Sequence, residues 1–122
     1  MASIVVIGSG GHAGVVADVV RRLGHRVLGF LAPTAAGART DAPYLGSDDE
    51  WLAGGSARGA CAVLGVGKVR TGGARAALVT KFVSAGVRMP AFVAPSATVG
   101  GGVRLAEGTV VLDGAVVATG SR

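Results

Sequence analysis

From Val99 to Arg122 the sequence repeats every six residues, and this period restricts the possible folds more than any other feature. The four blocks read VGGGVR, LAEGTV, VLDGAV and VATGSR. Each block begins with an aliphatic residue, has glycine at its fourth position and has a small or β-branched residue at its fifth. That spacing is typical of a prism whose sides are short strands and whose corners turn every six residues. Because three blocks complete one coil, residues 96–122 are predicted to form an incomplete coiled domain; a glycine- and valine-rich strand meander is the alternative, but it would not require a strict period.

The first 95 residues have a different pattern, in which short apolar runs alternate with helical stripes. Ser3–Ile7 is a β-branched run without polar alternation, as in a strand covered on both faces of a parallel sheet. Ala13, Val16 and Val20 recur at helical spacing until Gly24 ends the stripe. In chain order the patterns predict strands over 3–7, 26–31, 60–66 and 89–95, helices over 13–23 and 74–85, and a short helix that begins with a Ser47–Glu50 capping box. The order predicts an α/β domain over residues 1–95, a small Rossmann-like parallel sheet with flanking helices.

Composition limits the classes of function. Of the 122 residues, 50% are hydrophobic and 4% aromatic, which is enough for one packed aliphatic core. The formal net charge of +5 favours anionic ligands, but no aromatic side chains alternate with the scattered arginines, so nucleic acid is a poor fit. Cys61 is the only cysteine, which excludes a disulfide within one chain, and its apolar neighbours predict a buried, inert thiol. Neither a metal site nor a membrane span is predicted, and we expect a cytoplasmic protein.

A glycine cluster stands where the first predicted strand gives way to the first helix. Residues Gly8–Ala13 read GSGGHA, which fits the G-x-G-x-x-G/A form of the dinucleotide fingerprint. In a parallel α/β sheet this junction binds phosphates, because main-chain NH groups at a helix start point outward with partial positive charge. Gly8 is expected to make the tight turn, Gly10 to permit close approach of a ligand, and Ala13 to let the helix pack on the strand. A strand-to-helix turn without a ligand is the alternative.

A nicotinamide site requires one further residue, an acid at the tip of the second strand that holds the ribose hydroxyls. Here that tip reads GFLAP, and the nearest acid, Asp41, lies well inside the following loop. Binding of NAD by an oxidoreductase is therefore disfavoured. A phosphate or pyrophosphate of another ligand remains compatible, since the main-chain NH groups do not depend on that acid.

Polar side chains near this junction complete the candidate site. His12 is placed to donate a hydrogen bond to a phosphate or sugar oxygen, with a capping or packing role as the alternative. Ser9 has no arranged base around it, so a ligand contact or a plain turn role is favoured over a nucleophile. Lys68 and Arg70 follow the third strand and can face phosphates, or be ordinary solvated residues. The candidate substrate-binding residues are thus Gly8, Ser9, Gly10, Gly11, His12, Lys68 and Arg70.

Taken together, the motifs resemble a known family. VVIGSGGHAGVVAD, VLGFL, LGSDDEWL, AVLGVG and APSATVGGGVRLAEGTVVLDGAVV follow one another in the order found in bacterial sugar acetyltransferases with a left-handed β-helix. Relatives in that family include sialic acid O-acetyltransferases and N-acetyltransferases of UDP-linked 4-amino sugars. The resemblance implies a Rossmann-like domain that holds a nucleotide sugar or sugar acid, and a hexapeptide β-helix that forms homotrimers and binds acetyl-coenzyme A between subunits. It places the family's glycine-rich substrate loop on Gly8–His12.

The chain departs from the family pattern at several points. Ala32 and Pro33 stand where the family often has acids after the second strand, and Ala94 replaces a histidine at the entry to the β-helix. The family's general-base histidine lies further along the β-helix, and no histidine follows Val99. His25 is expected to be a solvated loop residue. We therefore expect a truncated chain or natural fragment without a catalytic residue or a tightly bound cofactor: the substrate-binding part of a sugar acetyltransferase, or alternatively a noncatalytic nucleotide-binding or assembly module.

Overall fold

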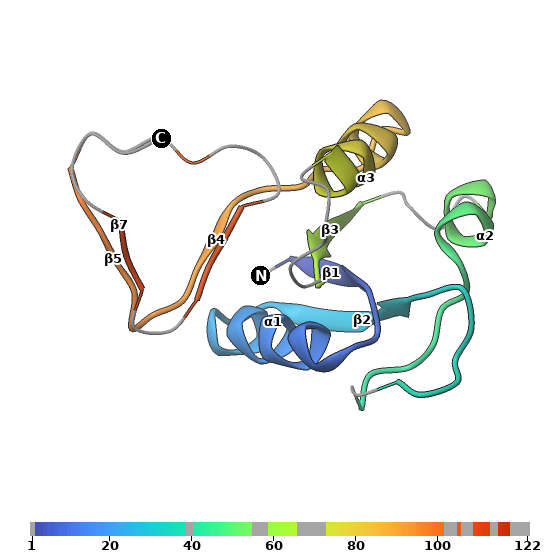
Figure 1. Cartoon of the computed structure of the whole chain (residues 1–122), viewed down its shortest axis with the longest axis horizontal. Coiled ribbons are helices and arrows are strands. Elements are labelled where there is room, and N and C mark those ends of the chain that lie inside the picture. Colours follow the sequence, from blue (N-terminus) through green and yellow to red (C-terminus); the bar gives the residue numbers. More distant parts are fainter. Residues whose placement is uncertain are drawn as a thin grey trace.

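The computed structural model describes residues 2–38, 41–54, 59–65, 73–101, 105, 109–112 and 115–117. Its centre is a three-stranded parallel sheet with the order β2-β1-β3 (Figure 1). The strands are β1 (Ser3–Ile7), β2 (Arg26–Leu31) and β3 (Ala60–Leu64). Ser3 of the central strand is level with the first residue of both neighbours, so all three strands begin at one edge, the amino edge, and end at the opposite carboxyl edge.

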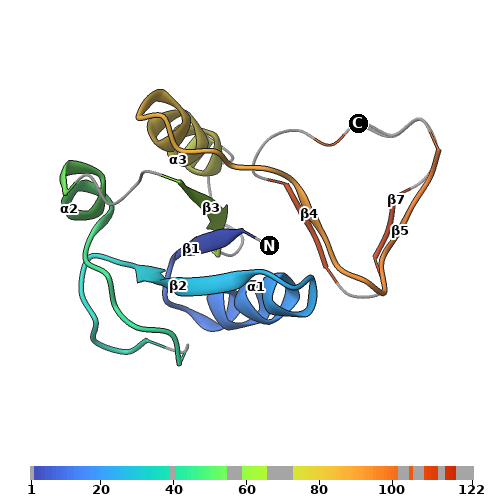
Figure 2. The same ribbon diagram turned by 180° about the vertical axis from the view of Figure 1, so that it is seen from behind.

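Helices cover both faces of this sheet. The helix α1 (Gly11–Arg22) lies on one face, and α2 (Asp48–Ala53) and α3 (Gly73–Ser84) lie on the other (Figures 1 and 2). Alternate residues of β1 supply the two cores: Ile4 and Val6 pack with α1, whereas Val5 and Ile7 pack with Trp51 and Phe82. This alternation explains why the strand reads as a continuous apolar run. The predicted α/β fold is confirmed, and the three sheet strands begin where the sequence predicted.

Irregular segments cover both outer sides of the sheet. Beside β2, the NH of Phe30 donates to the carbonyl of Pro43 at 2.8 Å, and the NH of Leu45 donates back to Phe30 at 2.9 Å. This segment approaches closely because Gly29 has no side chain: a Cβ there would overlap the Pro43 oxygen. Beside β3, the NH of Ala62 donates to the carbonyl of Arg88 at 2.9 Å. Neither outer strand therefore offers a continuous row of unpaired peptide groups.

The C-terminal part forms a separate coil of short parallel strands. Within it, β4 (Phe92–Val93) pairs with β6 (Val110–Val111), and β5 (Thr98–Val99) pairs with β7 (Val116–Val117). Each partner lies three periods of the sequence repeat further along the chain. Figures 1 and 2 show these strands as two sides of an open loop beside the amino edge of the sheet.

The prediction that residues 89–95 form the last strand of the α/β sheet is wrong. The segment that bridges to β3 is at Arg88, opposite Cys61, and Phe92–Val93 pair with β6 instead. Met89, which is 1% exposed, packs in the core on the α3 side, and Pro90 has no NH with which to continue a ladder. The chain therefore leaves the sheet after one bridge and enters the coil.

The expectation that His25 is a solvated loop residue is correct for the loop, but the side chain is half-buried and has partners. Its Nδ1 accepts a hydrogen bond from the NH of Ala2 at 3.1 Å. Its ring meets the ring of Phe92 edge-on, with centroids 5.5 Å apart and planes at 75°. His25 thus connects the start of the sheet to the first strand of the coil, and its half-buried position follows from a contact with a residue that is distant in the sequence.

Candidate functional site

The glycine turn lies at the carboxyl edge of the sheet, between β1 and α1. Gly8 has φ of 124°, a conformation that residues with a Cβ rarely adopt. Its NH donates to the carbonyl of Leu31 at 2.8 Å, so the turn is fixed to the end of β2. The predicted role of Gly8 as the residue that makes the tight turn is therefore consistent with its backbone conformation.

The start of α1 presents main-chain NH groups to solvent. Gly10 is the N-cap residue and provides no side-chain cap, and the first turn contains no acidic residue. The NH of Ala13 donates to the carbonyl of Gly10 at 3.1 Å. Within the described part of the chain, no group accepts a hydrogen bond from the NH groups of Gly11 and His12. Such a helix start carries a partial positive charge that attracts an anion.

Gly10 differs from Gly8 in the reason why glycine suits the position. Its φ of −78° and ψ of −171° are open to any residue. A Cβ built there would meet no described atom within 4 Å. The fold itself therefore does not require glycine at this position, and the open space lies on the solvent side of the turn. The expected close approach of a ligand to Gly10 is compatible with this geometry and stays a prediction.

Ala13 and Gly65 bring the helix start against the sheet. Ala13 is fully buried, as expected for a small residue on which the helix packs. Gly65 follows β3 directly, and its NH donates to the carbonyl of Ile7 at 2.8 Å. A Cβ on Gly65 would lie 2.9 Å from Cα of Ala13 and 2.6 Å from Cγ1 of Val6. Sequence reasoning did not single out Gly65; the available signal was a glycine immediately after a buried parallel strand.

The acid nearest to the second strand lies far from this turn. The Asp41 carboxylate accepts a hydrogen bond from the Arg21 guanidinium at 3.3 Å, and Arg21 lies in the last turn of α1. With a rise of about 1.5 Å per residue, the helix between Gly11 and Arg21 separates these two residues by about 15 Å. Asp41 is thus held toward the opposite end of α1 from the glycine turn. Asp41 is therefore bonded to Arg21 and not placed beside the glycine turn.

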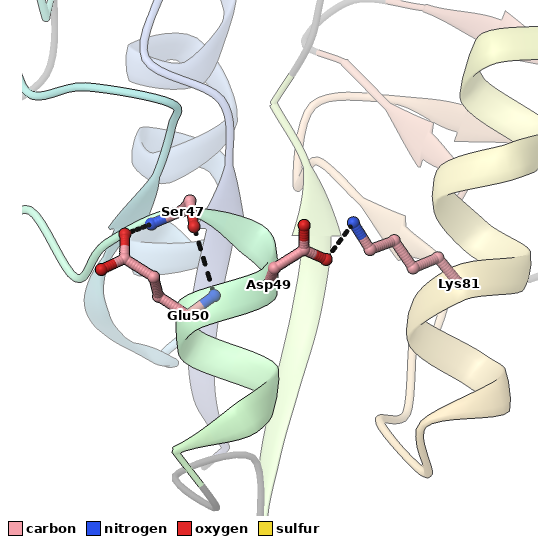
Figure 3. Close-up of polar contacts among 4 residues, drawn as sticks. All are labelled: Ser47, Asp49, Glu50 and Lys81. Carbon is pink, nitrogen blue, oxygen red and sulfur yellow. Dashed lines mark hydrogen bonds and ion pairs between the residues drawn. The ribbon is translucent and has the colours of Figure 1, made fainter.

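The short helix α2 begins at the same carboxyl edge, and its first turn is held by polar contacts (Figure 3). The Oγ of Ser47 accepts from the NH of Glu50 at 3.2 Å, and the Glu50 carboxylate accepts from the NH of Ser47 at 3.1 Å, which confirms the predicted capping box. Asp49 forms an ion pair with Lys81 of α3 at 2.7 Å. Burial raises the pKa of the Asp48 carboxyl, and the nearby positive charge of Lys81 partly offsets this rise. The ion pair thus connects α2 to α3 on one face of the sheet.

The remaining predicted site residues are only partly located. Ser9 and His12 are half-buried in the glycine turn, and Gly11 is exposed. Lys68 and Arg70 lie outside the described residues. Cys61 is 3% exposed, as predicted. In the described ranges no group of three or more His, Cys, Asp or Glu side chains could hold a metal ion, and no helix there is long and apolar enough to cross a membrane.

An open groove lies at the other edge of the sheet. It has a volume of about 570 Å³ and is lined by Ala2, Cys61, Val83 and residues 86–90. Ala2 precedes β1 and Cys61 is at the start of β3, so the groove faces the amino edge and not the glycine turn. Its lining among the described residues is mainly apolar and includes the cation Arg88. Because phosphate recognition in parallel sheets occurs at the carboxyl edge, we place the candidate nucleotide site at the turn.

The parallel sheet and its glycine turn define the Rossmann-like class of α/β domains. Within that class, residues 3–81 match the family described as the PglD N-terminal domain, and the chain belongs to that family. A comparison with the curated proteins gave no match.

Solved structures extend the similarity beyond the α/β domain. The acetyltransferase domain of PglB from Neisseria gonorrhoeae FA1090 is 28% identical with a TM-score of 0.80, over 95% of this chain and 56% of that one. A mutant of perosamine N-acetyltransferase from Caulobacter crescentus, in complex with CoA and GDP-perosamine, is 31% identical with a TM-score of 0.79, over 95% of this chain and 54% of that one. The chain therefore spans little more than half the length of these proteins. The resemblance to sugar acetyltransferases is confirmed.

Proposed function

We propose that this chain is the substrate-binding part of a sugar acetyltransferase that acts on a nucleotide-linked or acidic sugar, and that its glycine turn binds the diphosphate or the sugar of that substrate. The observation that carries the proposal is Gly10, a glycine that the fold does not require, next to main-chain NH groups without acceptors among the described residues. Gly8, Ser9, Gly11 and His12 complete the proposed contact surface. The complex of the Caulobacter crescentus enzyme with GDP-perosamine supports a nucleotide-linked sugar as ligand.

Acetyl-coenzyme A is the proposed acetyl donor. In such a transfer the amine or hydroxyl of the sugar attacks the thioester carbonyl, a base removes the proton, and the coenzyme A thiol leaves. We assign no described residue to the role of base; the proposed task of this chain is to hold the acceptor sugar. The complex of the PglB acetyltransferase domain with acetyl coenzyme A supports the choice of donor.

We further propose that the coil is the first turn of a left-handed hexapeptide β-helix, and that the complete β-helix forms a homotrimer. The register of the coil, in which each strand pairs with one that follows it by three sequence periods, supports a coil of three six-residue sides. The predicted boundary between the two domains, at residues 95 and 96, and the cytoplasmic location are kept as proposals.

Titration calorimetry tests the binding proposal. GDP-perosamine, a UDP-linked amino sugar, CMP-sialic acid and NAD are each titrated into the chain, and we expect one of the sugar nucleotides to bind and NAD not to bind. Binding of NAD without binding of any sugar nucleotide would contradict the proposal.

A pair of glycine variants locates the site. Gly10→Ala places a methyl group on the solvent side of the turn, where it meets no described atom within 4 Å, so we expect unchanged folding. Ligand affinity is expected to fall about tenfold or more, which corresponds to weakening one hydrogen bond to a charged group. Gly101→Ala is the matched control, since its Cβ also meets nothing within 4 Å but lies in the coil. Equal affinities of the two variants would rule out the glycine turn as the binding surface.

A further inference from the structure

We propose that Gly65 is a positioning residue that sets how closely the first turn of α1 approaches the sheet, and thereby where the NH groups of the glycine turn point. This inference rests on the proposed function, because it concerns the same phosphate-binding turn. It adds a residue that is distant from Ala13 in the sequence and whose contribution is the absence of a side chain.

Glycine is required at this position for space and not for backbone conformation. Gly65 is not among the described glycines with positive φ, so a residue with a Cβ could adopt its backbone conformation. The obstacle is contact: a Cβ would lie 2.6 Å from Cγ1 of Val6, 2.9 Å from Cα of Ala13 and 3.1 Å from Cβ of Ala13. One of these contacts is with the helix backbone, which cannot avoid it by changing a rotamer.

On the sheet side of this contact, Gly65 and Val6 cannot easily move. The NH of Gly65 is bonded to the carbonyl of Ile7, and Val6 is 1% exposed within the core on the α1 side. Interiors are close-packed, so displacement of Val6 would disturb several neighbours at once. The first turn of α1 is the freer partner, because Gly10 and Gly11 are exposed to solvent. An added methyl group at position 65 would therefore push the helix start outward.

Movement of Ala13 carries the candidate binding groups with it. Ala13 is the third residue of α1 and follows Gly11 and His12 directly. Its NH is bonded to the carbonyl of Gly10, so a shift of Ala13 also acts on the N-cap residue. Hydrogen bonds weaken steeply when donor and acceptor are misaligned, so a small displacement is enough to reduce binding of a phosphate.

The test compares Gly65→Ala with Gly29→Ala. Both substitutions force a methyl group against a close neighbour, but the one at position 29 meets Pro43 and Leu45 beside β2 and not α1. Backbone amide NMR spectra of both variants report the environment of the NH groups in the glycine turn, and GDP and UDP serve as calorimetric probes. We expect Gly65→Ala to shift the amide resonances of Gly10, Gly11 and His12 and to weaken nucleotide binding about tenfold or more.

The control decides between a positioning role and general destabilisation. Gly29→Ala is expected to lower the thermal midpoint while the amide resonances of the turn and the nucleotide affinity stay close to those of the wild type. Equal effects of both variants on the turn, or unchanged turn resonances in Gly65→Ala, would overturn the inference.

A second variant covers the case in which Gly65→Ala does not fold. Ala13→Gly removes the Cβ that faces Gly65 from the helix side, and the double variant Ala13→Gly/Gly65→Ala relieves part of the overlap. We expect the double variant to fold, with amide resonances of the glycine turn closer to the wild type than those of Gly65→Ala. If Gly65→Ala alone does not fold, we expect the double variant to recover folding. If the double variant recovers neither folding nor the turn resonances, this would count against the contact between Gly65 and Ala13. If the wild type binds neither GDP nor UDP, the proposed function is weakened, while the resonance shifts still decide the positioning role.

Discussion

The α/β domain and the coil obtain their stability in different ways. The α/β domain has two cores, one on each face of the sheet, and most of their buried residues belong to that domain. In the described part of the coil only Phe92, Ala94 and Val111 are buried hydrophobic residues. Phe92 belongs to the core on the α1 side, and Val110 and Leu112 pack against it. The comparison shows that the β4–β6 side of the coil is anchored to the α/β domain, whereas Thr98 and Val99 on the β5 side are exposed or half-exposed.

The largest expected difference between the two regions comes from truncation of one buried side chain in each. Phe82 is fully buried and stacks on Trp51, so Phe82→Ala should lower the free energy of unfolding by about 3–5 kcal/mol. Val111→Ala removes two carbon atoms from a buried side chain of the coil and should cost about 1.5 kcal/mol. Urea unfolding followed by Trp51 fluorescence measures both. A loss at Val111 as large as that at Phe82 would mean that the coil is an integral part of the main core.

The contact between the two regions can be tested at His25. His25→Ala removes a hydrogen bond and an aromatic contact, together worth about 1–2 kcal/mol. Hydrogen exchange should accelerate at Phe92 and Ala94, whose NH groups are bonded within the coil, and stay slow at Ala62 in β3. His25→Phe keeps a ring against Phe92 and should give a smaller effect. Uniform acceleration across both regions would show that His25 supports the whole fold and not the junction.

A substitution at the start of α2 tests whether a change within the α/β domain leaves the coil unaffected. Ser47→Ala removes the side-chain half of the capping box on α2 and should lower the free energy of unfolding by about 1 kcal/mol. Ser47→Asp keeps an acceptor at the N-cap and should remain close to the wild type. Exchange rates in the coil are expected not to change in either variant. A thermal melt of the two proteins side by side gives the stability difference, and equal midpoints would show that the cap is dispensable.

The smallest expected effect concerns the ion pair between α2 and α3. The hydrogen bond to Asp49 raises the pKa of Lys81 above its ordinary value. The contribution of the ion pair to the free energy of unfolding is therefore fully present below about pH 10.5 and disappears as pH rises through the raised pKa. Because the ion pair lies at the surface, with the Asp49 side chain 85% exposed, its contribution should stay below about 1 kcal/mol. Asp49→Asn should therefore differ from the wild type at pH 8 and converge with it under alkaline conditions. A constant difference in unfolding free energy at all pH values would indicate another cause.

Local signals accounted for most of what could be predicted from the sequence. The apolar run of β1, the helical stripe of α1 and the Ser47–Glu50 capping box depend on neighbouring residues, and each was found where predicted. The glycine turn was recognised because its spacing is local as well. For the same reason the six-residue period predicted the coil, whose strands pair at three times that period.

The errors concern contacts between distant residues. Whether Phe92–Val93 joins the sheet or the coil depends on a partner strand three periods later, and His25 is covered by a ring from that same segment. A sequence signal for the pairing of Phe92–Val93 with the coil existed, since Val93 stands one period before Val99 and extends the series of aliphatic residues backward. No such signal existed for His25. Gly65 likewise gains its meaning only from the approach of Ala13, which the sequence does not record.

The regular offset between paired strands of the coil also governs how this region tolerates changes in length. Removal of one residue from a strand of the coil would shift the later residues of that strand by one place, exchanging those on its inner face with those on its outer face. Removal or duplication of three whole repeats would instead restore the same cross-section. Chains of this type can therefore evolve by gain or loss of whole turns, while single-residue insertions are confined to the corners.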